Sequence, residues 1–435
     1  FSGQLMSWVE LPYFTSCYLV LPAVFLCIEK AHRSSAIRKL AWSVGAGIFL
    51  AWSWLSGHPQ YVIYTHILLS VYWIIREWSV FRTHQTRVRA WILISFVCVM
   101  VISYIGGYPQ IQSILHANTS SSRSTGLQLT DYWSDALYPQ DIIHFFSPFF
   151  HIQGVPFSGL NLYIGILPLV LLVCGFMLRK KIIAATNNST VIHFFSYTFL
   201  FSFVYSFKYS PVAYLFYYAP LFSAFRNVSR MMFLGEFATA ILLAFTIDYL
   251  ITHKEEVRLS CTRILQWGRR IFFYVMLPVS AAITVVYAFY TDRVALYIWE
   301  YFIHHRSAPL SFPSEHYLTL IRSYVVENLG QVILYHKEMI ILTFFLIATY
   351  LLFVTWERLT TKALANSIII LTLANFVAVY ATHFSSIPLS VYTNTPQSVT
   401  SIRALADAQA RVYTVLPGQT IYSALNAECS TSSGS

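Results

Sequence analysis

Long apolar stretches dominate this chain of 435 residues and limit it to folds that a lipid bilayer accepts. Hydrophobic residues make up 57% of the sequence and charged residues only 11%, whereas soluble domains carry about 25% charged residues. The apolar runs approach the length that an α-helix needs to cross a membrane, and they do not alternate as the strands of a membrane barrel do. The composition therefore predicts an all-α polytopic membrane protein.

The apolar runs predict about ten transmembrane helices. The predicted spans cover residues 9–29, 40–56, 61–75, 90–106, 160–178, 191–207, 231–252, 271–290, 338–356 and 363–382. Five short loops between them hold 18 of the 28 Lys and Arg residues, namely 30–39, 76–89, 179–181, 254–270 and 358–362. Because positive residues in short loops mark the cytoplasmic side, residue 1 is expected outside. The formal charge of +10 then reflects orientation in a membrane and not a nucleic-acid partner.

The segments between the basic loops predict an extensive outer surface. We expect residues 1–382 to form the membrane domain, with long extracytoplasmic loops at 107–159, 208–230 and 291–337. The second of these loops is aromatic and is expected to lie flat or to re-enter the membrane. The stretch 138–150 is expected to form a short helix that lies in the interface. The third is expected to contain helices around 294–303 and 316–329. Residues 383–435 predict a linker and the start of an extracytoplasmic α/β domain, and both chain ends indicate a fragment of a longer protein.

The tetrapeptide Gly-X-Pro-Gln occurs twice, 50 residues apart, at the end of an apolar run in each case. The copies are Gly57-His-Pro-Gln60 and Gly107-Tyr-Pro-Gln110, and a His follows each Gln by six residues. Glycine ends a helix without a Cβ penalty and proline starts the next one with its φ preset. The repeat therefore predicts two turns on the outer face. His58, Gln60, Tyr108 and Gln110 are candidate cavity residues there, although a purely structural brace is the alternative.

Two arginines, Arg226 and Arg230, precede the apolar run 231–252 on the outer side, where topology requires no positive charge. If a helix begins near Asn227 or before it, the two guanidinium groups lie one turn apart on one face. Guanidinium groups bind phosphate in a bidentate manner, so the pair predicts a phosphate site. The alternatives are contacts with lipid headgroups or pairing with a carboxylate.

Several carboxylates are weaker candidates. Glu236 lies inside the same run, where it is expected either to neutralise an arginine or to accept a proton. Asp131, Asp135 and Asp141, with Arg123 nearby, lie in the first long outer loop and are possible catalytic groups, although outer carboxylates are usually only solvated. The six cysteines are dispersed, and no metal-ligand spacing or disulfide framework is visible. The sequence predicts no metal site but leaves a divalent ion as a possible cofactor.

The order of several short motifs resembles that of the YfhO-type bacterial membrane proteins, which are similar to the GT-C class of glycosyltransferases. The matching stretches are Phe1-Ser-Gly3, Ser56-Gly-His-Pro-Gln60, Pro109-Gln110, Ser122-Arg123, Phe146-Ser-Pro148, Tyr163-Ile-Gly-Ile-Leu-Pro168, Ala219-Pro220 and Phe225-Arg-Asn-Val-Ser-Arg230. The resemblance covers most of residues 1–382.

The resemblance implies an enzyme of the bacterial cytoplasmic membrane that moves a sugar from a polyprenyl-phosphate donor to a cell-envelope glycan or lipid-linked acceptor on the outer face. Arg226 and Arg230 would bind the donor phosphate and stabilise its charge as it leaves. The catalytic carboxylate of such enzymes lies in the first outer loop, which would precede residue 1. The alternatives are a transporter or flippase of lipid-linked saccharides and a non-catalytic protein of envelope assembly. Membrane lipids are expected partners in each case.

Overall fold

The structure is a computed structural model, and it describes residues 12–83, 86–119, 126–133, 136–146, 162–219, 222–254, 266–270, 272–305, 313–330 and 337–381. Regular structure in these ranges is helical throughout, and the described residues contain no β-strand. An isolated bridge joins Leu137 to Phe207. The predicted α/β domain at 383–435 lies outside the described residues.

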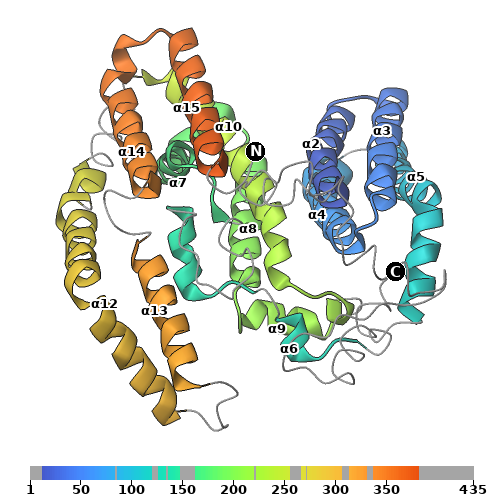
Figure 1. Cartoon of the computed structure of the whole chain (residues 1–435). Helices are drawn as coiled ribbons and strands as arrows, with labels where there is room; N and C mark the ends of the chain where they lie inside the picture. Colours follow the sequence, from blue (N-terminus) through green and yellow to red (C-terminus); the bar gives the residue numbers. More distant parts are fainter. Residues whose placement is uncertain are drawn as a thin grey trace, which may run out of the picture.

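Figure 1 shows the helices of the described ranges, coloured in chain order from blue to red. The longer helices are α2 (Pro12–His32), α3 (Ala36–Leu55), α4 (Pro59–Thr83), α5 (Thr86–Thr119), α7 (Ile166–Thr186), α8 (Ser189–Ser206), α10 (Met232–Thr252), α12 (Leu277–His305), α13 (Ser314–Gly330), α14 (Lys337–Thr355) and α15 (Thr361–Ala381). The short elements are α6 (Leu129–Tyr132), η1 (Pro139–Phe145), α9 (Pro211–Tyr217), η3 (Phe222–Ala224), η4 (Val228–Met231), η5 (Phe272–Met276) and η6 (Trp356–Arg358).

Five helical stretches are long and apolar enough to cross a membrane, which agrees with a multi-pass membrane protein. These candidate spans are Thr86–Ala117, Val228–Thr252, Gln266–His304, Met339–Arg358 and Thr361–Val379. The other five predicted spans also lie in helices, namely α2, α3, α4, α7 and α8.

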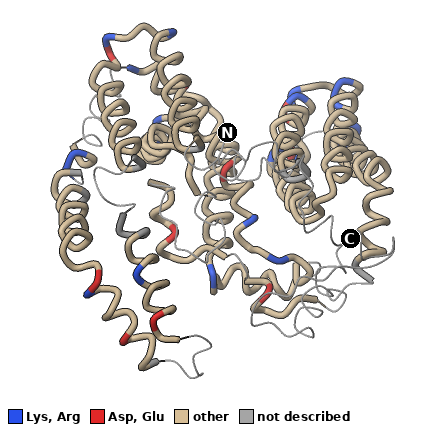
Figure 2. The backbone as a smooth tube through the Cα atoms, in the orientation of Figure 1, with Lys and Arg blue, Asp and Glu red and all other residues tan. Residues whose placement is uncertain are grey.

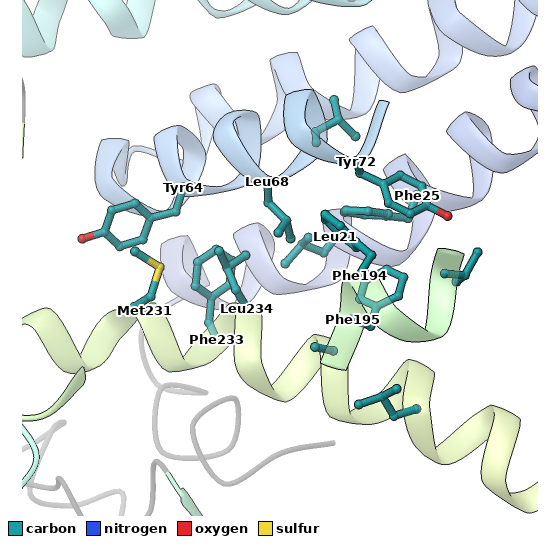
Figure 3. Packing of buried hydrophobic residues seen from close by; sticks show 14 of the residues in the cluster. Leu21, Phe25, Tyr64, Leu68, Tyr72, Phe194, Phe195, Met231, Phe233 and Leu234 are labelled. Carbon is teal, nitrogen blue, oxygen red and sulfur yellow. The ribbon is translucent and has the colours of Figure 1, made fainter. Parts of the chain in front are cut away.

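Aromatic and aliphatic side chains join the N-terminal helices to α8 and α10. Phe25 of α2 contacts the rings of Tyr72 on α4, Phe195 on α8 and Phe237 on α10, with centroid distances of 5.1, 5.7 and 5.0 Å. Figure 3 shows this cluster, in which Tyr64 and the neighbouring α4 side chains face α10. This cluster places the start of α4 beside the start of α10, where the candidate site lies.

Charged side chains gather at the basic ends of the helices. In Figure 2, Lys and Arg lie at the upper end of the view, where α2 meets α3 and α14 meets α15. Buried polar contacts tie three helices together just below the first of these turns. Glu77 of α4 accepts hydrogen bonds from Lys39 of α3 and from His32 of α2 at 3.2 Å. This arrangement is consistent with the predicted cytoplasmic position of these loops.

The second Gly-X-Pro-Gln copy does not form the turn that the sequence predicts. Helix α5 continues without interruption from Thr86 to Thr119 and includes Pro109. Its glycines instead permit close packing against α3. A Cβ added at Gly107 would lie 2.5 Å from the Cβ of Trp54, and one at Gly106 would lie 2.7 Å from the Cβ of Ala51. The first long outer segment therefore begins later than predicted, after Thr119.

The predicted third outer loop is also more helical than expected at its start. The apolar run from Leu277 to residue 290 and the expected helix around 294–303 form one continuous helix, α12, which ends at His305; the π-helical turn η5 precedes it. Aromatic side chains stack where α12 meets α13, with Tyr317 centred 6.3 Å from Trp299 and 6.1 Å from Phe302. The expected helix at 316–329 is confirmed as α13.

Candidate functional site

The first Gly-X-Pro-Gln copy forms the turn that its sequence predicts. Helix α3 ends at Leu55 and α4 begins at Pro59. Gly57 has a φ of +88°, a left-handed conformation that disfavours residues with a side chain. The turn places His58 just before α4 and Gln60 in its first turn. Both side chains reach toward Arg230, which precedes α10.

A buried arginine binds this turn. Arg230 is only 9% exposed, and its Nη1 donates to Gln60 Oε1 at 3.1 Å and lies 3.2 Å from His58 Nε2. Gln60 in turn donates through Nε2 to the Tyr64 hydroxyl at 3.1 Å and to the Asn227 carbonyl at 3.5 Å. The amide of Gln60 thus faces the guanidinium with its oxygen and the neighbouring acceptors with its nitrogen. The contact spans 170 residues of sequence and fixes the position of the positive charge.

The two candidate arginines occupy different environments. Arg226 is exposed and makes no hydrogen bond or ion pair with a described residue. Asn227, between the arginines, has a φ of +64°, and a 3-10 turn from Val228 precedes α10. The expectation that one helix face carries both arginines is therefore wrong, because a left-handed residue breaks the helix between them.

The second Gly-X-Pro-Gln copy lies beside the first but contributes differently. Tyr108 is 58% exposed and accepts a hydrogen bond from Gln112 at 2.9 Å. Gln110 is half-buried, and its Nε2 is the nearest neighbour of a Cβ placed on Gly57, at 3.7 Å. Of the second copy, therefore, only Gln110 adjoins the turn that contacts Arg230.

Glu236 lies buried on α10, in the same aromatic surroundings. Phe233, on the same helix, contacts the Tyr18 ring at 5.5 Å and the Tyr61 ring at 4.7 Å. Both interpretations of Glu236, a counter-ion and a proton acceptor, remain compatible with this position.

The candidate aspartates do not form a carboxylate cluster among the residues that the structure describes. Asp131 is exposed on α6. Asp141 is buried, accepts the backbone N–H of Tyr138 at 2.7 Å and lies 3.8 Å from His144, which makes it a cap of η1. Asp135 and Arg123 lie outside the described residues. Nor do three His, Cys, Asp or Glu side chains meet within the described ranges to hold a metal ion.

An apolar groove of about 620 Å³ lies between α4 and α8 and was not predicted from the sequence. Along α4 it runs from Tyr64 to Ile75, a distance of about 17 Å at 1.5 Å per residue. Along α8 it runs from Ser202 back to Thr190, and Phe216, Phe222, Met231 and Leu234 complete its outer end. Tyr64 lines the groove and bonds Gln60, and Met231 follows Arg230 directly. The groove therefore ends beside the Arg230 cluster, meaning Arg230 with His58 and Gln60.

Spacing on α4 alone contains a signal for the groove. Tyr64, Leu68, Val71 and Ile75 recur at intervals of three or four residues, as on one helix face. The same pattern occurs in any packed helix, so the sequence does not separate a groove from a core contact.

Comparisons with protein-family models, curated proteins and solved structures found no match to this chain.

Proposed function

We propose that this chain is a membrane glycosyltransferase that takes a sugar from a polyprenyl-phosphate donor and transfers it to an envelope glycan or lipid-linked acceptor on the outer face of the bacterial cytoplasmic membrane. The observation that carries the proposal is the junction of the apolar groove with the Arg230 cluster. A polyprenyl phosphate consists of a long apolar chain that ends in a phosphate. The apolar groove would bind the chain, and the Arg230 cluster at the end of the groove would bind the phosphate.

The burial of Arg230 supports this assignment over a headgroup contact at the surface. A guanidinium that is 9% exposed experiences weaker solvent screening than a surface arginine. His58 and Gln60 orient the Arg230 guanidinium through its Nη1. In the proposed reaction an acceptor hydroxyl attacks the anomeric carbon, the donor phosphate leaves, and Arg230 stabilises the charge that develops on it. Exposed Arg226 would meet the phosphate from the solvent side.

The proposal includes ten transmembrane helices, with the termini of the described chain on the outer side. Asp131 is the remaining exposed candidate among the described aspartates, since Asp141 is engaged at the start of η1.

Binding of undecaprenyl phosphate to the purified chain in nanodiscs tests the site. We expect Arg230→Gln to weaken binding about 10- to 100-fold, because hydrogen bonds to charged groups contribute about 1.5–3 kcal/mol. Undecaprenol, which lacks the phosphate, should bind wild type and Arg230→Gln equally. Ile67→Trp, which fills the groove, should weaken both ligands, whereas Ile74→Trp on the exposed face of α4 outside the groove should change neither. Equal binding of the phosphate by wild type and Arg230→Gln would refute the phosphate site.

A lipid-saccharide flippase is the second candidate, and the extent of the groove favours it. The groove continues to Thr190 and His193 in the first turns of α8, near the basic inner loops. A headgroup path across the membrane needs such an extension. Vesicles that contain the protein and a labelled polyprenyl-phosphate sugar distinguish the two functions. Release of the sugar from its carrier supports transfer, whereas movement of the intact lipid between leaflets supports a flippase.

A further inference from the structure

Lys208, just after the end of α8, is held in place by contacts with two tyrosines. Lys208 follows the end of α8 by two residues. Its Nζ donates to the Tyr138 hydroxyl at 2.7 Å and lies 4.8 Å from the Tyr138 ring centroid and 5.4 Å from that of Tyr209. No described carboxylate forms an ion pair with Lys208. The hydrogen bond with Tyr138 raises the pKa of Lys208 against a smaller opposing effect of burial, so the cation persists at neutral pH.

The backbone at this point is fixed in an unusual conformation. Tyr209 has a φ of +61° and is 75% exposed. A left-handed conformation costs a residue with a side chain about 1–2 kcal/mol. Backbone hydrogen bonds hold it in place, from Lys208 N to Leu137 O at 2.7 Å and from Ser210 N to Phe207 O at 3.1 Å. These hydrogen bonds therefore keep the exposed Tyr209 ring beside Lys208.

Helix α9 continues the same surface. Its inner face is anchored, since the Tyr132 hydroxyl donates to the Ala213 carbonyl at 3.1 Å and the Tyr217 hydroxyl donates to the Leu127 carbonyl at 2.7 Å. Its outer face presents Leu215, 71% exposed, and beside it the exposed rings of Tyr214 and Tyr218, whose hydroxyls are hydrogen-bonded to each other at 2.9 Å. An exposed leucine beside two tyrosines is poorly suited to a sugar surface but well suited to the boundary between hydrocarbon and headgroups.

We propose that the segment Lys208–Tyr218 seats in the outer leaflet and that Lys208 binds an anionic lipid headgroup there. Leu215 enters the acyl boundary, the tyrosines lie at headgroup level, and the lysine supplies the charge for a phosphodiester. Phe216 of α9 lines the apolar groove. Contact of the segment Lys208–Tyr218 with the membrane would therefore hold the outer end of the groove at the depth of the lipid headgroups. The inference concerns lipid binding alone and does not depend on sugar transfer.

The first test measures depth in nanodiscs. An environment-sensitive label is placed on Leu215→Cys in a full chain whose six native cysteines are replaced by alanine. Asp131→Cys, on the exposed part of α6, is the control. Lipids that carry a spin label just below the headgroup should quench the label at 215 several-fold more than the label at 131. Equal quenching at the two positions would show that α9 lies in water and would overturn the proposal.

The second test measures lipid selectivity. Wild type is reconstituted with equal amounts of phosphatidylglycerol and phosphatidylcholine, extracted, and its retained lipid is analysed. Lys208→Ala should retain about five-fold less phosphatidylglycerol, Lys208→Arg should retain the wild-type amount, and Lys180→Ala, an exposed lysine at a basic inner loop, should not change it. Unchanged retention in Lys208→Ala refutes the headgroup site. Displacement of the lipid by a polyanionic oligosaccharide such as oligogalacturonate would assign the site to a glycan instead.

Discussion

Replacing Gly107 by alanine tests whether the second Gly-X-Pro-Gln copy serves helix packing. The added Cβ would lie 2.5 Å from Trp54 Cβ, 2.6 Å from Trp54 Cγ and 2.8 Å from Trp54 Cδ1. Because the nearest of these atoms is the Cβ, no rotation of the indole relieves the contact. Helices α3 and α5 must separate, and such overpacking costs about 1–3 kcal/mol.

Alanine also improves helix propensity by about 0.8–1.0 kcal/mol over glycine, which would mask part of the effect. Gly45→Ala is therefore the matched control, because the new Cβ meets its nearest atom, Cys27 Sγ, at an ordinary 3.4 Å. Both variants gain the same propensity, so their difference isolates the overpacking. We expect Gly107→Ala to be less stable than Gly45→Ala by about 1–3 kcal/mol. Thermal unfolding of the purified chain in detergent measures this difference.

Equal stability of the two variants would refute the close contact between α3 and α5. The first copy provides a separate comparison, because Gly57 is required for its φ of +88° and not for space. Asparagine tolerates left-handed backbone better than other residues with side chains. Gly57→Asn should therefore be milder than Gly57→Val, whereas Gly107→Asn should be at least as harmful as Gly107→Ala. The reverse order would show that the two glycines do not have the different roles that the structure gives them.

Three further perturbations address the bundle. Glu77→Gln leaves the buried ammonium of Lys39 without its carboxylate and should destabilise the chain by about 3–5 kcal/mol in thermal unfolding, while a smaller loss would mean that the pair is solvated. Asn375→Leu removes the acceptor of the Tyr163 hydroxyl at 2.7 Å and should cost about 1–3 kcal/mol by the same assay, with Tyr163→Phe restoring part of the loss in the double variant. A cysteine at Asp131, which is exposed on α6, should react with an impermeant thiol reagent from outside, and one at the exposed Lys180 only from inside; the opposite pattern would overturn the predicted orientation.

The positions of the helices were largely predictable, because length and hydropathy decide them. The described part of each predicted span lies largely in a helix, and the first Gly-X-Pro-Gln copy forms the expected turn between α3 and α4. What hydropathy could not predict is where a helix continues beyond the apolar run. Helix α5 extends past Gly107 and Pro109 to Thr119, and α12 extends past residue 290 to His305. In both helices the continuation is polar or interrupted by proline, so its stability depends on tertiary contacts that no local pattern contains.

The candidate site was predictable only in its separate parts. Arg230 was identified from its position before an apolar run, and Gln60 from the repeated tetrapeptide. Their contact joins residues 170 positions apart and depends on how α4 packs beside α10. The expected pairing of Arg226 with Arg230 rested on a continuous helix, and the left-handed Asn227 prevents it. Sequence spacing predicts which residues are neighbours within one helix. The neighbours of Arg230 in this site come from the start of another helix, α4.

The two copies of Gly-X-Pro-Gln show why a repeated motif need not have a repeated role. A positive charge that is only 9% exposed needs polar neighbours in an apolar bundle, and the first copy supplies them through His58 and Gln60 at the start of α4. The second copy lies within α5, which packs against α3. There the backbones of α3 and α5 approach closely, and the glycines of the copy leave room for this approach. Exchanging the tetrapeptides should therefore change little in the second helix, since glycine and proline are common to both. Placing tyrosine at position 58 should instead disturb Arg230. A His58→Tyr variant that binds undecaprenyl phosphate as wild type does would show that Gln60 alone orients the arginine.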